Sequence, residues 1–375
     1  MRIRKMIILA CLVAAALGVK YYEHLQDPHV PLGTGPGGGI SSGGIPTGNK
    51  ADEKLAVRLD EYMRQQGFNG TLLVQRQGRT VISKGYGYAD AHEKRLNTPD
   101  TKFIIGSITK SFIAASILQL AEQGKLHIDD NVHHYIPSFP ESKGITLRNL
   151  LQHTSGLPNR RYEHGREAVN AEDHAKLVQW IGKQKLQFQP GTGWMYSDRN
   201  YMVLGYVVER VSGQHAEDYV REHMIRKAGL QHTAIGRPAQ ADPMLSTGYK
   251  SENGKWQVDA GLNWPWLYSC GNVYMTAGDL VRFDQALMDG TLVSTESARL
   301  MLIPSAVKNY GMSFYQTDLC EFNHGVISGW DVYNNFNLRD HTFVIVMSNA
   351  VDYLPKDFNK TVQKMVWGQD GGENL

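Results

Sequence analysis

The position of the β-rich runs constrains the fold of this chain more than any other feature. Residues 70–75 and 79–88 are rich in strand-forming residues and predict a hairpin near the start of the chain. Residues 325–338 and 342–348 predict a second strand pair near the other end. The residues between these regions read mostly as helices and loops. The sequence therefore predicts one α+β unit, whose antiparallel sheet is built from both ends of the domain, with flanking helices and an inserted helical lobe.

The first residues of the chain look like a targeting segment. Three cations within the first five residues precede an uncharged run, Met6–Val19. A basic start followed by a short apolar run is typical of secretory export. The run is short for a membrane span, but Lys20 and the two tyrosines after it can extend it at the interface. Residues 1–22 are predicted to be a signal peptide or a membrane anchor, and both alternatives remain open.

Composition separates a tether from the folded part. Residues 23–50 are rich in Gly, Pro and Ser, which predicts a flexible linker. Residues 51–370 then form the predicted folded domain. The chain has Lys+Arg 39 against Asp+Glu 37, a net charge of +2, which argues against a nucleic-acid partner. Whether residues 1–22 are cleaved or retained, the domain is predicted to be extracytoplasmic, either membrane-anchored or secreted.

A serine and a lysine at the start of a helical pattern are the first candidate catalytic residues. Ser107 and Lys110 project from the same face of the first turn because they are three residues apart. There the helix dipole favours a developing anion, and a facing lysine can activate the hydroxyl. Ser-x-x-Lys is common by chance, so the pair gains weight only from other motifs.

Further motifs accompany this pair in a fixed order. They are His153-Thr154-Ser155-Gly156-Leu157, Tyr196-Ser197-Asp198, Cys270-Gly271-Asn272 and His324-Gly325. With these motifs the chain resembles the serine β-lactamase and penicillin-binding-protein-like hydrolases, from about residue 53 to about residue 367. It is most similar to the class C β-lactamase branch, which includes DD-carboxypeptidases, esterases and teichoic-acid D-alanine esterases.

The resemblance implies a β-lactamase/transpeptidase-like fold and a two-step acyl transfer. Ser107 would be the acylated nucleophile, Lys110 its partner and Tyr196 a general acid/base. The resemblance also implies substrate-binding roles for Asp198, His324 and Gly325, with Lys110 and His324 supplying positive charge near Tyr196. The Ser107 N–H and a backbone N–H on the strand after His324 would form the oxyanion hole. No metal and no cofactor are predicted.

Two positions depart from the family pattern. Asp198 stands where the family usually has Asn, and an ionised carboxylate can only accept hydrogen bonds. Such a carboxylate would keep Lys110 protonated, which favours ester substrates over amides. Val326 stands where the family has a glycine. The strand half of the oxyanion hole is therefore left unassigned, with nearby Gly329 as the alternative glycine that leaves space for the substrate.

These observations predict a cell-surface serine hydrolase acting on D-alanyl groups of the cell envelope, with a D-alanyl esterase on teichoic acid as first choice. The alternatives are a DD-carboxypeptidase on peptidoglycan stem peptides, a broad esterase or β-lactamase, and a catalytically weak binding or sensor protein. The predicted partners are an envelope substrate and, through the N-terminal segment, a membrane. Two questions stay open: whether Cys270 pairs with Cys320, and whether Trp264, Trp266 and Tyr268 line the substrate cleft.

Overall fold

The computed structural model describes residues 49–140, 143–159, 170–238, 241–252, 255–259 and 261–368. The predicted leader, and all but the last two residues of the predicted linker, lie outside these residues. In the part of the chain that is described, no helix is both long and apolar enough to cross a bilayer.

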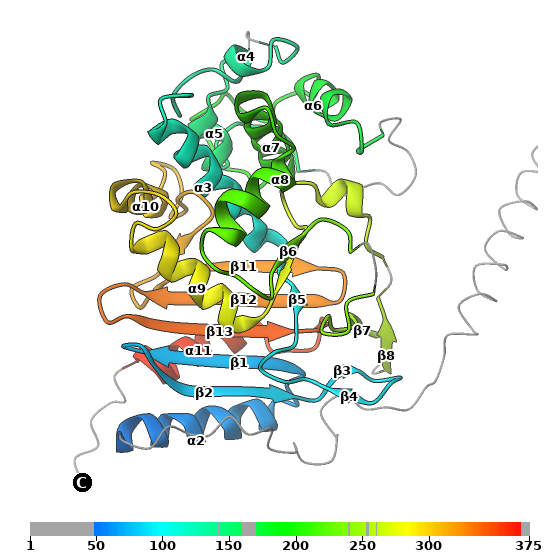
Figure 1. Ribbon diagram of the computed structural model, residues 1–375, viewed down its shortest axis with the longest axis vertical. Helices are drawn as coiled ribbons and strands as arrows, with labels where there is room; N and C mark the ends of the chain where they lie inside the picture. Colours follow the sequence, from blue (N-terminus) through cyan, green and yellow to red (C-terminus); the bar gives the residue numbers. More distant parts are fainter. Residues whose placement is uncertain are drawn as a thin grey trace, which may run out of the picture.

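A six-stranded sheet forms the centre of the molecule, and both ends of the chain contribute to it (Figure 1). Its strand order is β10-β11-β12-β13-β1-β2, and every neighbouring pair is antiparallel. The N-terminal hairpin meets the C-terminal strands where Gly70 pairs with Ser348. The strands are β1 (Gly70–Arg76), β2 (Arg79–Tyr86), β10 (Tyr315–Gln316), β11 (Glu321–Ile327), β12 (Trp330–Asn337) and β13 (Thr342–Ser348). This arrangement confirms the predicted fold class.

Helices α2 (Lys50–Gln65) and α11 (Phe358–Trp367) cover one face of this sheet. Apolar residues of α2 recur on one side of the helix, where Leu55, Leu59 and Met63 are buried. They share a core with Val344 and Val346 of β13. The first and last helices of the domain therefore close the same face of the sheet.

The opposite face carries the larger core and the helical lobe, which stands above β11 in Figure 1. Helix α9 crosses the sheet, and the lobe is built around α3 and α7, which pack against each other. The helices are α3 (Thr109–Glu122), α4 (Val132–Tyr135), α5 (Leu147–Leu151), α6 (His174–Gly182), α7 (Asp198–Ser212), α8 (Ala216–Val220), α9 (Ala277–Met288) and α10 (Thr295–Leu302), with short turns η1 (Gly106–Ile108), η3 (Arg221–Arg226) and η4 (Trp264–Leu267).

Short strands connect the lobe to the sheet. Three small sheets have the orders β14-β7-β8, β3-β4 and β5-β9-β6. Their strands are β3 (Tyr88–Asp90), β4 (Arg95–Leu96), β5 (Phe103–Ile104), β6 (Ala234–Ile235), β7 (Tyr249–Glu252), β8 (Lys255–Val258), β9 (Val273–Met275) and β14 (Ala350–Val351). Strand β5 leads directly into η1 and α3, so it fixes where the predicted Ser-x-x-Lys segment begins.

The predicted single strand over residues 325–338 is wrong. The structure divides this range into the end of β11 and the whole of β12, joined by the turn Ser328-Gly329. Gly329 has φ 80°, which this tight turn requires and which glycine adopts without strain. Strands are recognised by alternating apolar and polar residues. A turn of two residues keeps this alternation in step, so the pattern alone does not show where one strand ends and the next begins.

A polar cluster is buried between α9 and the sheet. Asp284 of α9 is fully buried, and its Oδ1 accepts a hydrogen bond from Asn334 Nδ2 at 3.2 Å. Burial raises the pKa of the Asp284 carboxyl well above its usual range, which favours the protonated form of this group. Among the described residues, Asp284 Oδ2, Asn334 Oδ1 and both side-chain polar atoms of Asn323 have no hydrogen-bond partner. The sheet therefore carries an incompletely satisfied polar layer beneath β11 and β12.

Candidate active site

Ser107 lies in the turn η1, between β5 and α3, and its side chain is partly exposed. Gly106 before it has φ 50°, a left-handed conformation that lets the chain turn sharply into the helix. At the first turn of a helix the Ser107 N–H has no intrahelical carbonyl to bond. The partly exposed Ser107 therefore has a backbone N–H that makes no hydrogen bond within the helix.

Lys110 lies one turn further along, on the first turn of α3, and is fully buried. Its Nζ contacts three oxygen acceptors: Ser107 Oγ at 3.0 Å, the Cys270 carbonyl at 3.0 Å and Asp198 Oδ1 at 2.8 Å. A lysine ammonium has three N–H donors and no acceptor. The site therefore satisfies every donor of the protonated lysine.

Electrostatics also favour the protonated form. Burial alone would lower the pKa of Lys110, but the negative charge and hydrogen bond of Asp198, together with the charges that Tyr196 and Cys270 can carry, outweigh burial and raise the pKa above its usual value. The cationic form of Lys110 is therefore favoured in the free protein, and its Nζ lies beside Ser107 Oγ.

Tyr196 and Asp198 reach the site from the start of α7. The Tyr196 hydroxyl lies 2.6 Å from Ser107 Oγ, and its ring lies 5.0 Å from Lys110 Nζ. Burial raises the pKa of Tyr196 to about 12, although the Lys110 cation partly opposes this rise. The phenol is therefore neutral at rest, and it can both accept a proton from Ser107 and give its own proton to another oxygen.

His153 contacts the segment that carries Tyr196 and Ser197. Its Nδ1 lies 2.7 Å from Asn200 Nδ2 and accepts the Ser197 N–H at 3.3 Å. Burial lowers the pKa of His153 well below its usual value, so the ring is neutral. The imidazole packs 4.4 Å from the Tyr196 ring, measured between centroids. These contacts fix the loop that presents Tyr196, which is a positioning role.

The edge of β11 completes the site. Ile327 pairs with Trp330 across a two-residue turn, so this closing pair forms hydrogen bonds within the hairpin. Because hydrogen-bonded pairs alternate along an antiparallel ladder, Val326 directs its N–H and C=O toward the outer edge of the sheet. That edge packs against η1.

Gly325 allows the strand to come this close. A Cβ on Gly325 would lie 1.9 Å from the Ile105 carbonyl oxygen and 3.1 Å from Ser107 N. A Cβ on Gly106 would lie 3.2 Å from Val326 N. The outward N–H of Val326 therefore lies beside the catalytic turn, and the glycine that this approach requires is Gly325. Gly329 belongs to the hairpin turn instead.

The structure does not bring the His324 side chain to Ser107. Side chains alternate along a strand, so His324 projects to the face opposite the Gly325 Cβ position. There its Nε2 lies 2.6 Å from Asp331 Oδ1, and its ring stacks on Tyr333 with centroids 4.1 Å apart. Tyr333 packs against the α2 and α11 core. These contacts therefore do not support the prediction that His324 supplies positive charge near Tyr196.

The structure also bears on the two open questions about side chains. Cys270 and Cys320 are both free and buried, so they do not form a disulfide. Trp266 and Tyr268 are buried, whereas Trp264 lines a cavity of about 760 Å³ together with Trp330, near the β11–β12 turn. Sequence reasoning missed the Cys270 carbonyl as a Lys110 acceptor, because a backbone carbonyl carries no residue-type signal.

Comparisons with known proteins identify the family of the chain. The family described as Beta-lactamase matches residues 55–361. The chain is 39% identical over 308 residues to "Putative penicillin-binding protein PbpX" of Bacillus subtilis, covering 81% of this chain and 77% of that protein. It is 32% identical over 269 residues to the teichoic acid D-alanine hydrolase of Staphylococcus aureus, covering 70% of this chain and 64% of that protein.

A solved structure is similar over most of the fold. The crystal structure of FmtA from Staphylococcus aureus superposes with a TM-score of 0.76 at 26% identity, covering 87% of this chain and 92% of that chain. The family match spans the sheet, the lobe and the residues around Ser107. The chain belongs to the β-lactamase family of serine hydrolases.

Proposed function

We propose that this enzyme is an extracytoplasmic D-alanyl esterase, with D-alanylated teichoic acid as its substrate. The observation that carries the proposal is the Lys110–Asp198 ion pair, in which Nζ and Oδ1 are 2.8 Å apart while 30% of the Asp198 side chain remains exposed. The site thus presents a carboxylate to the substrate where the family usually has an amide.

The first step is attack of Ser107 Oγ on the ester carbonyl carbon. Tyr196 accepts the serine proton as it gives its own proton to the leaving alkoxide, so the phenol remains neutral overall. Lys110 stabilises the negative charge that passes through Oγ, and the N–H groups of Ser107 and Val326 bind the carbonyl oxygen. Water then hydrolyses the acyl-enzyme by the same exchange in reverse, releasing D-alanine.

The partly exposed carboxylate of Asp198 is the reason for assigning a D-alanyl ester. The D-alanine on such an ester has a free α-ammonium, which is a charged donor, and an ionised carboxylate is an acceptor only. In a stem peptide, the nitrogen of the acyl-donating D-alanine is an amide and carries no charge. The carboxylate therefore favours the ester substrate over the peptide.

The relatives support an envelope substrate and leave its identity open. One is named as a teichoic acid D-alanine hydrolase and another as a penicillin-binding protein. The second name favours a DD-carboxypeptidase as the other candidate function. Both substrates lie outside the cytoplasmic membrane, in agreement with the predicted leader. Residues 1–22 would then act as a signal peptide or anchor.

The test is to measure D-alanine release by the purified enzyme from D-alanylated teichoic acid and from a peptide ending in D-Ala-D-Ala. We expect release from the polymer, and the Ser107→Ala variant should release none. Release from the peptide alone would refute the esterase proposal and support the carboxypeptidase. Release from neither substrate, with no labelling of Ser107 by a fluorophosphonate, would refute both.

A further inference from the structure

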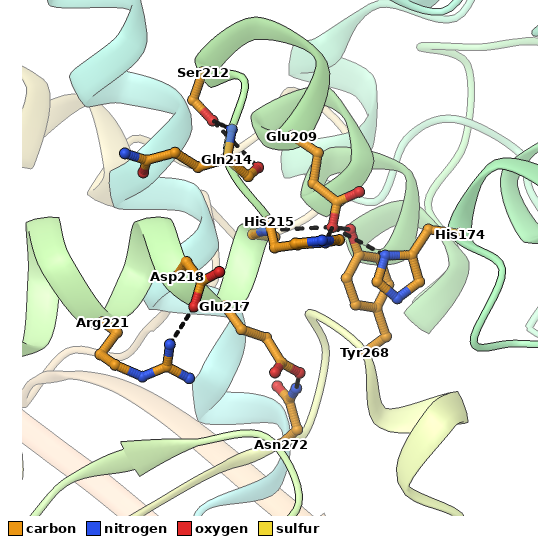
Figure 2. Close-up of polar contacts among 11 residues, drawn as sticks. His174, Glu209, Ser212, Gln214, His215, Glu217, Asp218, Arg221, Tyr268 and Asn272 are labelled. Atoms are coloured by element: carbon orange, nitrogen blue, oxygen red, sulfur yellow. Dashed lines mark hydrogen bonds and ion pairs between the residues drawn. The ribbon is translucent and has the colours of Figure 1, made fainter.

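Two histidines and a glutamate gather at the corner between α7 and α8. His174 begins α6, Glu209 lies near the end of α7, and His215 is the residue before α8. One ligand atom from each side chain lies within 4.8 Å of the other two. Figure 2 shows the three side chains converging on one point, with Tyr268 beside them.

The distances suit a metal ion. His174 Nδ1 lies 2.9 Å from Glu209 Oε1, and His215 Nδ1 lies 3.8 Å from the same oxygen. Ligands about 2.0–2.1 Å from a tetrahedral zinc ion lie about 3.3 Å from one another. Small side-chain rotations would therefore bring all three atoms to bonding distance, and His215 is free to move because its side chain is 79% exposed.

Neighbouring groups hold the ligands in place. Tyr268 donates its hydroxyl to Glu209 Oε1 at 2.9 Å, and its ring stacks on His174 with centroids 3.6 Å apart. The Ala216 N–H also donates to Glu209 Oε1, at 3.2 Å. Outer contacts of this kind orient metal ligands and tune their basicity. Glu209 and His174 are mostly buried, with side chains 13% and 23% exposed, so two of the three ligands are already ordered.

We propose that His174, Glu209 and His215 form a binding site for a divalent transition-metal ion such as Zn²⁺. Two imidazole nitrogens and one carboxylate oxygen suit zinc and its neighbours, whereas Mg²⁺ and Ca²⁺ prefer oxygen ligands. Water would complete the tetrahedron. The ion would join the start of α6 to the α7–α8 corner.

The site would stabilise the active site indirectly. Tyr268 contacts two of the ligands and lies two residues before Cys270, whose carbonyl accepts a hydrogen bond from Lys110. Restraining this loop restrains one of the three Lys110 acceptors. The proposed ion takes no part in the chemical step. Sequence spacing gives no sign of this site, because the three residues belong to separate segments of the chain: the start of α6, the end of α7 and the position before α8.

The experiment is Zn²⁺ titration of the chelator-treated full-length protein by calorimetry, with the melting temperature followed in parallel. We expect one strong site per chain and a higher melting temperature with Zn²⁺. His215→Ala should weaken this site by at least about 100-fold, since even loss of an outer contact costs about 10- to 100-fold. It should also abolish the zinc-dependent rise in melting temperature.

The control is His92→Ala, which removes an exposed histidine on the turn after β3. It should bind Zn²⁺ like the wild type. His215 is exposed, so its replacement should leave the metal-free melting temperature unchanged. Equal Zn²⁺ affinity in the wild type and His215→Ala, or equal loss in both variants, would overturn the proposal. So would the absence of a one-to-one site in the wild type.

Discussion

Replacing Asp198 by Asn tests the proposed substrate through a single charge. Asn has nearly the same shape as Asp, but its side chain is neutral and carries two donors. The variant therefore keeps a group beside Lys110 while removing the carboxylate that would receive the substrate ammonium. We expect Asp198→Asn to lose its preference for D-alanyl esters with a free amino group.

The size of the effect follows from exposure. A hydrogen bond to a charged group contributes about 1.5–3 kcal/mol when well shielded. The Asp198 side chain is 30% exposed and one of its oxygens already pairs with Lys110, so solvent screening reduces this value. We expect about 1.4 kcal/mol, which is about a tenfold change in relative kcat/KM.

The assay compares two esters of one alcohol, D-alanyl and N-acetyl-D-alanyl, and reports the ratio of their kcat/KM values. The wild type should prefer the free amine, and Asp198→Asn should lower that ratio about tenfold. The ratio cancels any effect of the substitution on Lys110, because both substrates use the same nucleophile.

A matched control uses another ion pair. Asp242 Oδ2 lies 2.8 Å from Lys102 Nζ, outside the site, so Asp242→Asn removes a similar pair without touching Ser107. It should leave the substrate ratio unchanged. An unchanged ratio in Asp198→Asn, with activity retained on both esters, would refute the assignment of Asp198 to the ammonium.

Three further changes test other parts of the structure. Tyr196→Phe should lower kcat about 10²- to 10⁴-fold without changing the midpoint of urea unfolding, and an unchanged kcat would remove the phenol from proton transfer. Gly325→Ala should lower kcat at least about 100-fold, because the new Cβ would force β11 away from η1. The control is Gly271→Ala, whose Cβ would be 3.4 Å from its nearest neighbour, and it should keep kcat. A comparable loss in both variants would count against the oxyanion assignment. Asp284→Asn should stabilise the protein more at pH 8 than at pH 5, as measured by urea unfolding. Burial raises the folded-state pKa of this carboxyl, so folding takes up a proton above the unfolded pKa. The wild type therefore loses about 1.4 kcal/mol of stability for each pH unit between its unfolded and folded pKa values. Equal stabilisation at both pH values would contradict this reasoning.

The residues predicted from the sequence that do converge in space share one property. Ser107 and Lys110 lie at the start of one helix, and Tyr196 and Asp198 at the start of another. Helix starts have local signals in the sequence, so both segments could be placed before their contact was known. Their convergence followed from the family resemblance, because nothing local links residues so far apart in the chain.

The strand half of the site could not be placed in the same way. Shifting a strand by one residue moves every side chain to the other face, and His324, Gly325 and Val326 could therefore be aligned in more than one way. Which side of the sheet each β11 side chain faces depends on the position of the turn Ser328-Gly329, and this turn was not among the predictions from the sequence. With that turn in place, Gly325 faces the serine and His324 faces the α2–α11 core.

The ion pair at Asp198 also links the substrate to the mechanism. A lysine whose three donors are all satisfied can act as a base only if it first loses a proton against the field of a carboxylate 2.8 Å away. Proton exchange through neutral Tyr196 avoids that cost and delivers one proton to the departing group. An alkoxide can leave as that proton arrives, whereas an amide nitrogen must be protonated before its bond to carbon can break. A carboxylate at position 198, which holds Lys110 as a cation, therefore favours the leaving group of an ester, and this preference supports the proposed ester substrate.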